Sequence, residues 1–415
     1  MKQSKFFSKT QKSITRDEVS ISSQLLIRAG FIDKVSAGIY TLMPLGFRVV
    51  TRIISIIRDE MEKVGGQEIY MPGLVPKSNW EQTDRWDNFD ALFKLKGADG
   101  KDYALGSTHE EIVTPLAKKF VFSYRDLPVG IFQIQNKFRD EIRAKSGLLR
   151  TREFLMKDLY SFHKNEEDLD KYYEILKDSY WKIFERVGIK DQSYLVYASG
   201  GSFSKYSHEF QTESEAGEDE IFVCKSCRVG LNRELLEDKY KCLECGGEDY
   251  NKKKCVEVGN IFKLRTKFSE PFKLFVKDEA GNDHLVEMGC YGIGIQRLMG
   301  TVAEVLHDQN GLVWPKEISP YDVHLIGLNL DDSKVSDEAE RIYSELKESG
   351  IMVLFDDRQD VNAGPKLKDA DLIGIGTRVV VSGKTVGKKL IEFKERTDTG
   401  SSLISLEELI SKLKK

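Results

Sequence analysis

The sequence predicts a mixed α/β (α+β) protein of two or three domains. The chain of 415 residues is longer than one ordinary hydrophobic core supports. Its last hundred residues alternate short apolar runs with amphipathic segments, as compact α/β domains do. A polar stretch over residues 218–256 holds two Cys-x-x-Cys pairs and has the character of an inserted module.

The elements before this module are predicted from hydrophobic periodicity. A helix is expected over residues 46–64, where apolar side chains recur at helical spacing and Gly65 follows as a stop. Strands and a long helix follow in this order: a strand at 67–71, a strand at 131–138, a strand-rich segment at 153–163 and a helix at 166–187. After the module, the Gly-rich segment around 285–300 predicts an apolar stretch followed by a helix.

The C-terminal part predicts alternating elements. The expected strands lie at 323–328, 351–355 and 379–381, and the expected helices lie between them at 333–349 and 365–373. The last helix begins with a capping box from Ser405 to Glu408.

Composition limits the class of protein. With 40% hydrophobic residues and a net charge of −4, the chain can bury sizeable cores and is not intrinsically disordered. We expect a soluble, cytoplasmic protein with no membrane segment, because no apolar stretch approaches the ~18 residues of a membrane span and no secretory signal is evident. In that compartment, paired cysteines indicate metal binding rather than disulfides.

The most informative motif is rich in arginine. Arg139, Arg143, Arg150 and Arg152 lie within fourteen residues on a predicted strand–loop–strand that continues to Phe154. Arginine predominates where a planar guanidinium group binds phosphate or stacks on a ring. A surface hairpin held by ion pairs is the alternative interpretation.

A second motif, from Met288 to Arg297, is rich in glycine. Its glycines allow close backbone approach at a strand-to-helix transition, although tight packing explains such a turn as often.

Together these motifs resemble the second and third signature motifs of class II aminoacyl-tRNA synthetases, and the helix at 46–64 with Pro72 resembles the first. Further runs narrow the resemblance to the prolyl-tRNA synthetase family: Ser107–Glu111, Phe138–His163, Ser207–Gln211, Glu257–Phe262 and the GCYGIG run. The resemblance covers nearly the whole chain except the cysteine module. It implies a catalytic domain with an antiparallel sheet over 1–319, including a zinc-ribbon-like insertion at 218–256, and an α/β anticodon-binding domain over 320–415.

The resemblance implies a proline–tRNA ligase. Such an enzyme uses ATP and Mg²⁺ to convert L-proline to prolyl-adenylate and then transfers proline to the 3′ end of tRNA(Pro). The first motif usually builds a homodimer interface, so a homodimer is expected. Two alternatives stay open: another synthetase of the same class, or an inactive paralogue that binds tRNA or regulates.

The resemblance also implies the nucleotide site. Arg139 would hold the α-phosphate, Glu141 the adenine amino group, and Phe154 and Arg297 the two faces of adenine. Arg139 and Arg297 are the expected catalytic residues. Further ATP contacts are expected from Arg150, Arg152 and Gln211, with Glu209 and Gln211 as the candidate Mg²⁺ ligands.

For proline, Thr108 and Glu110 are the amine-binding pair of the family, with Arg139 beside them. The other interpretation of Thr108 is a helix N-cap, since Thr108 and Glu111 fit a capping box. His163 and His208 are candidates for the pocket wall, although structural histidines are as common. Two departures from the family lie near this pocket: Asn260 replaces a frequent histidine, and the segment 200–206 is longer than usual.

Contacts with tRNA are expected from four basic residues. Arg143 lies in the loop of the second motif, near where the acceptor stem would bind. Arg358, Lys366 and Lys368 lie where the family contacts the anticodon, and ordinary surface charges are the alternative.

The cysteine module predicts a structural zinc site at Cys224, Cys227, Cys242 and Cys245. Fourteen residues separate the two pairs, and Gly246 and Gly247 follow the second, so that backbone amides can approach sulfur. A polar module this short cannot fold on hydrophobic burial alone and needs a bound metal or another cross-link. Redox pairs or a relic site are the alternatives, and the lone Cys255 and Cys290 are expected to be inert.

The position of the module matters for function. Many bacterial members of the family carry a large editing domain between the second and third motifs. Here only the cysteine module occupies that gap, so the chain resembles a short form without the editing insertion.

Overall fold

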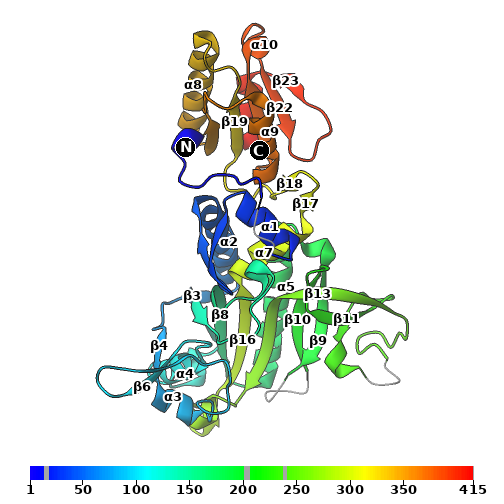
Figure 1. Cartoon of the computed structure of the whole chain (residues 1–415). Helices are drawn as coiled ribbons and strands as arrows, with labels where there is room; N and C mark the ends of the chain where they lie inside the picture. The colour runs from blue at the N-terminus through cyan, green and yellow to red at the C-terminus, as the bar shows by residue number, and fades with distance from the viewer. Residues whose placement is uncertain (14–17, 201–205, 237–240, 415) are drawn as a thin grey trace. The chain divides into compact units, whose positions relative to one another are not determined.

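The computed structural model describes residues 1–13, 18–200, 206–236 and 241–414. The chain forms two compact units (Figure 1). The terminal unit contains Met1–Val35, Tyr40–Arg52 and Val302–Lys415, and the central unit contains Ser36–Ile39 and Ile53–Thr301. Among the described helices, none has both the length and the apolar character to cross a bilayer.

A nine-stranded sheet organises the central unit. Its strand order is β10-β9-β12-β11-β13-β16-β8-β7-β3, and β10 also pairs with β13. The strands are β3 (Gly66–Glu68), β7 (Val129–Phe138), β8 (Glu153–His163), β9 (Ser193–Ser199), β10 (Tyr206–Glu213), β11 (Asp219–Cys224), β12 (Gly230–Asn232), β13 (Tyr250–Arg265) and β16 (Glu287–Gly294). Pairing is antiparallel except for β3–β7 and β12–β9. The predicted antiparallel sheet is therefore confirmed.

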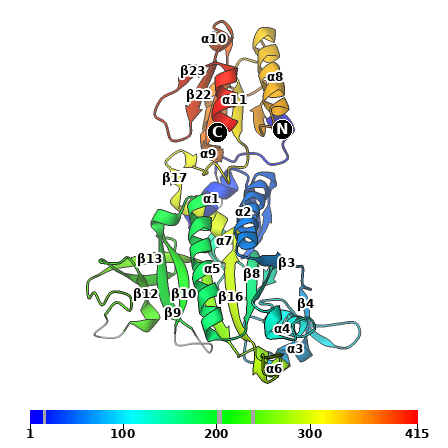
Figure 2. The same cartoon turned by 180° about the vertical axis from the view of Figure 1, so that it is seen from behind.

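Helix α5 (Glu166–Arg186) lies across this sheet (Figure 2). Asn165 caps it, because its side chain accepts a hydrogen bond from the amide of Asp168, and acidic residues fill the first turn. One face of the helix is buried against the strands, through Leu169, Tyr173, Leu176, Tyr180 and Ile183. Burial of this stripe explains why the periodicity predicted the helix to within one residue.

A smaller layer of the central unit carries the segment around Thr108. It contains the sheet β4-β6-β5 and two helices, with Trp80 fully buried in its core. The elements are β4 (Leu74–Pro76), α3 (Lys77–Gln82), β5 (Lys94–Lys96), β6 (Asp102–Leu105) and α4 (Glu110–Ala117). The unit also contains α6 (Ser269–Phe272), β14 (Phe275–Lys277), β15 (Asp283–Leu285) and α7 (Ile295–Val305), whose last residues belong to the terminal unit.

The C-terminal part of the terminal unit is a five-stranded sheet in the order β20-β19-β21-β22-β23, with helices packed on it. The elements are β19 (Val323–Gly327), α8 (Ser333–Glu348), β20 (Val353–Asp356), α9 (Ala363–Ile373), β21 (Thr377–Val381), α10 (Gly383–Val386), β22 (Ile391–Glu395), β23 (Ser402–Ile404) and α11 (Leu406–Lys414). The alternating α/β pattern expected here is confirmed. At the start of α11, Glu408 donates its amide hydrogen to Ser405, which is the first half of the expected capping box.

The N-terminal residues complete the terminal unit. Residue Lys2 pairs with Phe355 on β20, and Ser4 donates to the carboxylate of Asp357. The remaining elements are α1 (Ile21–Arg28), β1 (Ile32–Ser36), β2 (Ile39–Leu42), β17 (His307–Asp308), β18 (Gly311–Leu312) and α2 (Pro44–Lys63), whose residues from Ile53 on belong to the central unit. Helix α2 matches the helix predicted at 46–64, but the strand predicted at 67–71 ends at Glu68.

Candidate active site

The register of the central sheet brings the arginine-rich and glycine-rich motifs together. Strands β7 and β8 pair with Lys137 opposite Phe154, so the loop between them begins and ends at one edge of the sheet. The amide of Arg139 donates to the carbonyl of Arg152 at 2.8 Å and closes the base of that loop. Strand β16 pairs with β8 on the other side and leads into α7, which carries Arg297.

These segments line a cavity of about 220 Å³. Its lining includes Arg139, Glu141, Arg150, Glu257 and Arg297. Burial, together with the nearby charge of Arg297, lowers the pKa of Arg139 from its usual value. Three guanidinium groups, those of Arg139, Arg150 and Arg297, line the cavity beside four carboxylates, and guanidinium groups are common partners of phosphate and carboxylate.

Several predicted ATP contacts are paired with protein groups. The guanidinium of Arg150 donates to Glu141 at 2.7 and 2.9 Å and to Glu218 at 2.5 Å. Arg152 donates to the carbonyls of Glu141 and Ala37, so it shapes the loop backbone. These two arginines therefore hold Glu141 in place.

Phe154 lies below Arg139, whose guanidinium carbon is 5.2 Å from the ring centroid. The ring is 9% exposed and is not among the residues that line the cavity. In this conformation the phenyl face supports Arg139 through a cation–π contact.

Glu218, Asp219 and Glu257 form an acidic part of the cavity wall. Glu209 and Gln211 are not among the lining residues but lie beside them, since Gln211 donates from Nε2 to Glu209 and Asp219, at 2.9 and 2.8 Å. Burial, reinforced by the charge of Glu257, raises the pKa of Glu209 to about 8. The buried Oε1 of Gln211 has no hydrogen-bond partner among the described residues. Carboxylates with an orphaned amide oxygen fit a hard divalent cation, which would relieve the repulsion among them.

A second cavity of about 130 Å³ adjoins the first, since Arg139 lines both. Thr108 and Glu110 form part of its wall, with Asn260, Cys290 and other residues around them. The N-cap interpretation of Thr108 is wrong: the N-cap residue of α4 is His109, with no side-chain cap. Instead, the Thr108 hydroxyl accepts a hydrogen bond from Arg85 at 3.0 Å.

The cysteine module places its four thiols together. Their sulfur atoms all lie within 4.8 Å of one another, with the pairs Cys224–Cys245 and Cys227–Cys242 at 3.6 and 3.5 Å. Tetrahedral zinc with bonds of ~2.3 Å to sulfur requires sulfur separations of this size. Backbone amides of Ser226 and Cys227 donate to the sulfur of Cys224, as expected around a thiolate. The four residues therefore fit a closed zinc site.

Comparison with known proteins assigns the chain to a family. The class II core domain of the synthetases for Gly, His, Pro, Ser and Thr matches residues 93–306, and an anticodon-binding domain matches 322–415. The proline–tRNA ligase of Dehalococcoides mccartyi strain CBDB1 is 33% identical, with 100% of this chain and 98% of the relative covered. The chain belongs to the prolyl-tRNA synthetase family. The ligase of Persephonella marina is also 33% identical, over 99% of each chain.

Solved structures agree with this family at the level of the fold. The prolyl-tRNA synthetase of Cryptosporidium parvum with halofuginone and AMPPNP has a TM-score of 0.76 at 20% identity, covering 95% of this chain and 74% of that one. Its complex with L-proline and AMP has a TM-score of 0.75 at 21% identity, with the same coverage.

This chain is shorter than its relative from D. mccartyi. The alignment with the D. mccartyi relative spans 562 positions, whereas this chain has 415 residues. That relative therefore contains well over a hundred residues with no counterpart here, in agreement with a short form.

The two histidines expected in the wall of the proline pocket lie elsewhere. The Nδ1 atom of His163 lies 3.1 Å from Asp168, and the Nδ1 atom of His208 lies 2.8 Å from the hydroxyl of Tyr173. Neither residue is among those that line the two cavities. Burial lowers the pKa of both rings, so we interpret both as neutral structural groups.

Sequence reasoning gave no role in the smaller cavity to several residues that line it, including Arg85, Lys137, Asp158 and Cys290. Cys290 was expected to be an inert thiol. Its burial raises the pKa well above the usual value, so the thiol stays protonated while forming part of the wall. The alternation of β8 and β16 could have indicated Asp158 and Cys290, because Asp158 pairs with Gly292 in the adjoining strand.

The expected anticodon residues of the terminal unit differ in exposure. Lys368 is exposed, whereas Lys366 is 2% exposed and donates to the carbonyl of Gly327 at 2.7 Å. Arg358 donates to Asp356 and Asp369. In this conformation Lys366 stabilises the interior of the domain and does not present its ammonium to a base.

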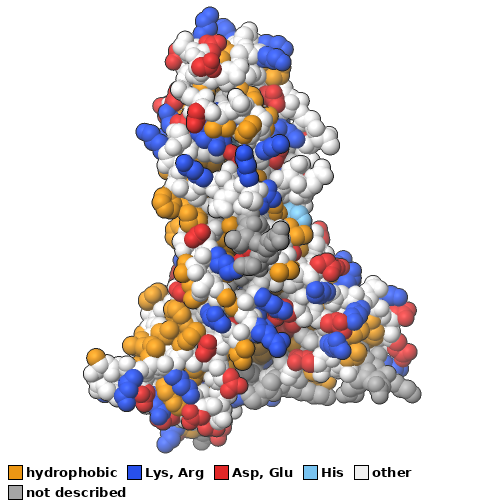
Figure 3. Space-filling model, viewed as in Figure 1, with side chains coloured by type: hydrophobic (Ala, Val, Ile, Leu, Met, Phe, Trp, Pro, Cys, Tyr) orange, Lys and Arg blue, Asp and Glu red, His pale blue; other side chains and the backbone are white. Residues whose placement is uncertain are grey.

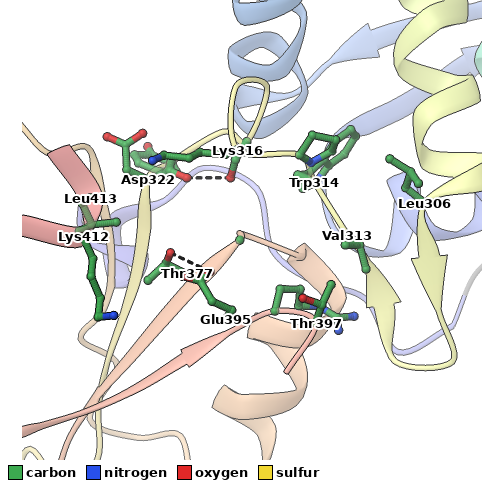
Figure 4. A pocket seen from close by; sticks show the side chains of 15 residues that line it. Leu306, Val313, Trp314, Lys316, Asp322, Thr377, Glu395, Thr397, Lys412 and Leu413 are labelled. Atoms are coloured by element: carbon green, nitrogen blue, oxygen red, sulfur yellow. Dashed lines mark hydrogen bonds between the residues drawn. The ribbon is translucent and has the colours of Figure 1, made fainter. Parts of the chain in front are cut away.

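A further cavity of about 310 Å³ lies in the terminal unit (Figure 4). Apolar residues such as Trp314 and Leu413 line it, and Thr377 donates to Glu395 at 3.3 Å. This cavity lies near the first residue of β21, whereas Arg358 lies just beyond the last residue of β20. Because β20 and β21 both pair with β19 in parallel, the cavity and Arg358 lie at opposite ends of these strands. The site residues predicted from the sequence all belong to the part of the chain that the structure describes, and none of them lines this cavity.

We predict a large loss of stability when Lys137 is replaced by methionine. Its ammonium lies 2.7 Å from Asp158, and both side chains are buried. Removing one partner of a buried pair leaves an uncompensated charge and costs about 3–5 kcal/mol. Thermal unfolding should show a lower midpoint for Lys137→Met. The double variant Lys137→Met/Asp158→Asn should recover part of the loss, and an unchanged midpoint in the single variant would contradict the pairing.

Proposed function

We propose that this chain is a proline–tRNA ligase. It activates L-proline with ATP to form prolyl-adenylate and then transfers proline to the 3′ end of tRNA(Pro). The observation that carries this proposal is that Arg139 lines both a larger cavity, which Arg150 and Arg297 also line, and a smaller cavity of amino-acid size. Family membership supplies the substrates: the relatives are proline–tRNA ligases, and the structural neighbours hold proline, AMP or AMPPNP.

Arg139 is the proposed centre of the first step. Its position allows it to contact both the α-phosphate of ATP and the carboxylate of proline. The carboxylate attacks phosphorus, and negative charge increases on the phosphoryl oxygens as pyrophosphate leaves. A preorganised guanidinium stabilises that charge more than it stabilises the ground state. No protein nucleophile is required, and positioning accounts for the rest.

Other residues of the larger cavity bind the nucleotide in this proposal. Glu141, held by Arg150 and Arg152, accepts a hydrogen bond from the adenine amino group. Arg297 covers one face of adenine, and Phe154 offers the other face once phosphate draws Arg139 away from its ring. Magnesium supplies charge neutralisation of the phosphates, with Glu209 and Gln211 as proposed ligands.

The smaller cavity is the proposed proline site. Thr108 and Glu110 provide a hydroxyl and a carboxylate for the two N–H groups of the secondary ammonium. The neutral wall near Asn260 and Cys290 faces the ring. His163 and His208 make no direct contact with proline in this proposal, because neither lines the two cavities.

For tRNA, we propose that residues 320–415 read the anticodon and that residues 1–319 form the catalytic domain. Arg143 is exposed in the motif loop and is the proposed contact with the acceptor stem. Arg358 and Lys368 are the remaining candidates for the anticodon. Because tRNA is charged where proteins are made, we place the enzyme in the cytoplasm.

The proposed homodimer uses the surface around β3 and β4. Apolar side chains gather over these strands (Figure 3), and Tyr70 and Leu74 are 79% and 48% exposed. Exposed apolar patches of this kind mark interfaces between proteins.

Proline-dependent ATP–pyrophosphate exchange tests the proposed activity. Exchange with proline and with none of the other amino acids supports it. Exchange driven by a different amino acid identifies another class II synthetase, and exchange with none identifies an inactive paralogue.

We also predict that the purified enzyme does not deacylate Ala-tRNA(Pro), because the chain lacks the residues of the editing insertion. The measurement is release of alanine from the isolated ester, with a family member that carries the insertion as positive control. Rapid hydrolysis that depends on residues 218–256 would refute this prediction.

A further inference from the structure

We infer that Arg85 is a positioning residue for proline, acting through the amine-binding pair. This inference rests on the proposed function and adds a residue that the motifs did not indicate. Arg85 follows α3, lines the smaller cavity, and directs one nitrogen of its guanidinium at three acceptors. From Nη1 the distances are 3.0 Å to the Thr108 hydroxyl, 2.8 Å to Glu111 and 3.4 Å to Glu110.

The surroundings of Arg85 hold its guanidinium still. It lies over the rings of Phe89, Trp80 and Phe268, at 4.5, 5.3 and 5.7 Å from their centroids. Its side chain is 17% exposed. Stacking on aromatic rings and exclusion of water both favour a single orientation of a planar cation.

Glu111 is the counter-ion of Arg85. Its side chain is 0% exposed, and it also accepts a hydrogen bond from Thr83 at 2.8 Å. Burial raises the pKa of Glu111, and the charge of Arg85 opposes that shift. Because the Arg85–Glu111 contact is shorter than the Arg85–Glu110 contact, the charge of Glu110 remains available to a substrate ammonium.

The hydroxyl of Thr108 gains a defined orientation from Arg85. A threonine oxygen has two lone pairs and one hydrogen. When Arg85 donates to one lone pair, the other is left to accept a hydrogen from the secondary ammonium of proline. The contact with Arg85 orients Thr108 and Glu110 before proline binds. Less conformational freedom is therefore lost when the ammonium of proline binds.

The charge-balanced variant Arg85→Met/Glu111→Gln tests this role. Methionine keeps an apolar stem over the rings, and glutamine avoids an uncompensated buried carboxylate. We expect the KM for proline in the exchange assay to rise roughly 10- to 100-fold, the range for a lost charge-assisted hydrogen bond. The KM for ATP should stay within about twofold of wild type.

An analogue of proline without the ammonium separates positioning from general damage. Tetrahydrofuran-2-carboxylate has the same ring and carboxylate with oxygen in place of nitrogen. Its inhibition constant should change less than about twofold in the double variant, since Arg85 acts on the amine pair alone. Equal losses for proline and the analogue, or an unchanged KM for proline, would overturn the inference.

Two more variants keep the test informative. Arg85→Lys retains a cation and should restore part of the proline KM. Arg125→Met, at an exposed arginine outside both cavities, is the matched control and should leave every constant unchanged. Wild-type protein without proline-dependent exchange would overturn the proposed function, whereas active wild type with an Arg85-independent KM would overturn only this inference.

Discussion

Replacing Arg139 with glutamine is expected to lower kcat/KM for proline-dependent ATP–pyrophosphate exchange by ~10³-fold or more. Loss of one preorganised donor to a developing oxyanion costs about 10²–10³ in rate, and Arg139 would also lose its contact with the proline carboxylate. Because Arg139 lines both cavities, the KM values for ATP and for proline should rise as well.

The control for this prediction is Arg125→Gln. Arg125 is exposed and contacts Tyr124, away from the two cavities. It should retain wild-type exchange. If Arg139→Gln kept more than about a tenth of the wild-type kcat/KM, the assignment of Arg139 to the reacting phosphate would be wrong.

Removing the proposed zinc should unfold the cysteine module. Structural zinc contributes about 10–16 kcal/mol of apparent binding free energy in small zinc-dependent folds. The module has few large apolar side chains that could replace it. We expect about one zinc per chain in purified protein, and loss of that zinc together with rapid proteolysis of residues 218–256 in Cys242→Ser.

The matched control is Cys255→Ala. Cys255 is buried on β13 and lies outside the four-thiol cluster, so this variant should retain zinc. Metal-free protein in which the module resists proteases and contains a disulfide would instead favour the redox interpretation.

Unfolding of the module should also disturb the larger cavity. Strand β11 runs from Asp219, which lines that cavity, to Cys224, which belongs to the thiol cluster. On β13 the ladder with β11 ends at Cys255, and the next two residues, Val256 and Glu257, line the same cavity. A module that supports the sheet in this way explains why its loss should raise the KM for ATP as well.

Much of the fold was predictable because it is encoded locally. The buried stripe of α5 repeats at helical spacing, and Asn165 and the acidic first turn mark its start. The spacing of Cys224, Cys227, Cys242 and Cys245 predicted a cluster that the structure confirms. The convergence of Arg139 and Arg297 on one cavity followed from motif resemblance rather than from periodicity.

The misses share one cause, which is dependence on distant segments. Thr108 matched a local capping pattern, but the helix begins two residues later and the hydroxyl faces Arg85. Lys366 was expected on the surface, but its ammonium donates a hydrogen bond to the carbonyl of Gly327 inside the domain. Arg85 belongs to no motif, and only the packing of three separate segments gives it its partners.

The sequence by itself determined the order of the elements, the four-thiol cluster and the membership of a family, since each depends on the identity and spacing of residues along the chain. Only the tertiary structure decided that Arg139 is shared by two cavities, that His163 and His208 lie outside them, and that Arg85 donates to Thr108 and Glu110. Strand register and side-chain packing join residues far apart in sequence, and no local pattern records which distant group a side chain will meet.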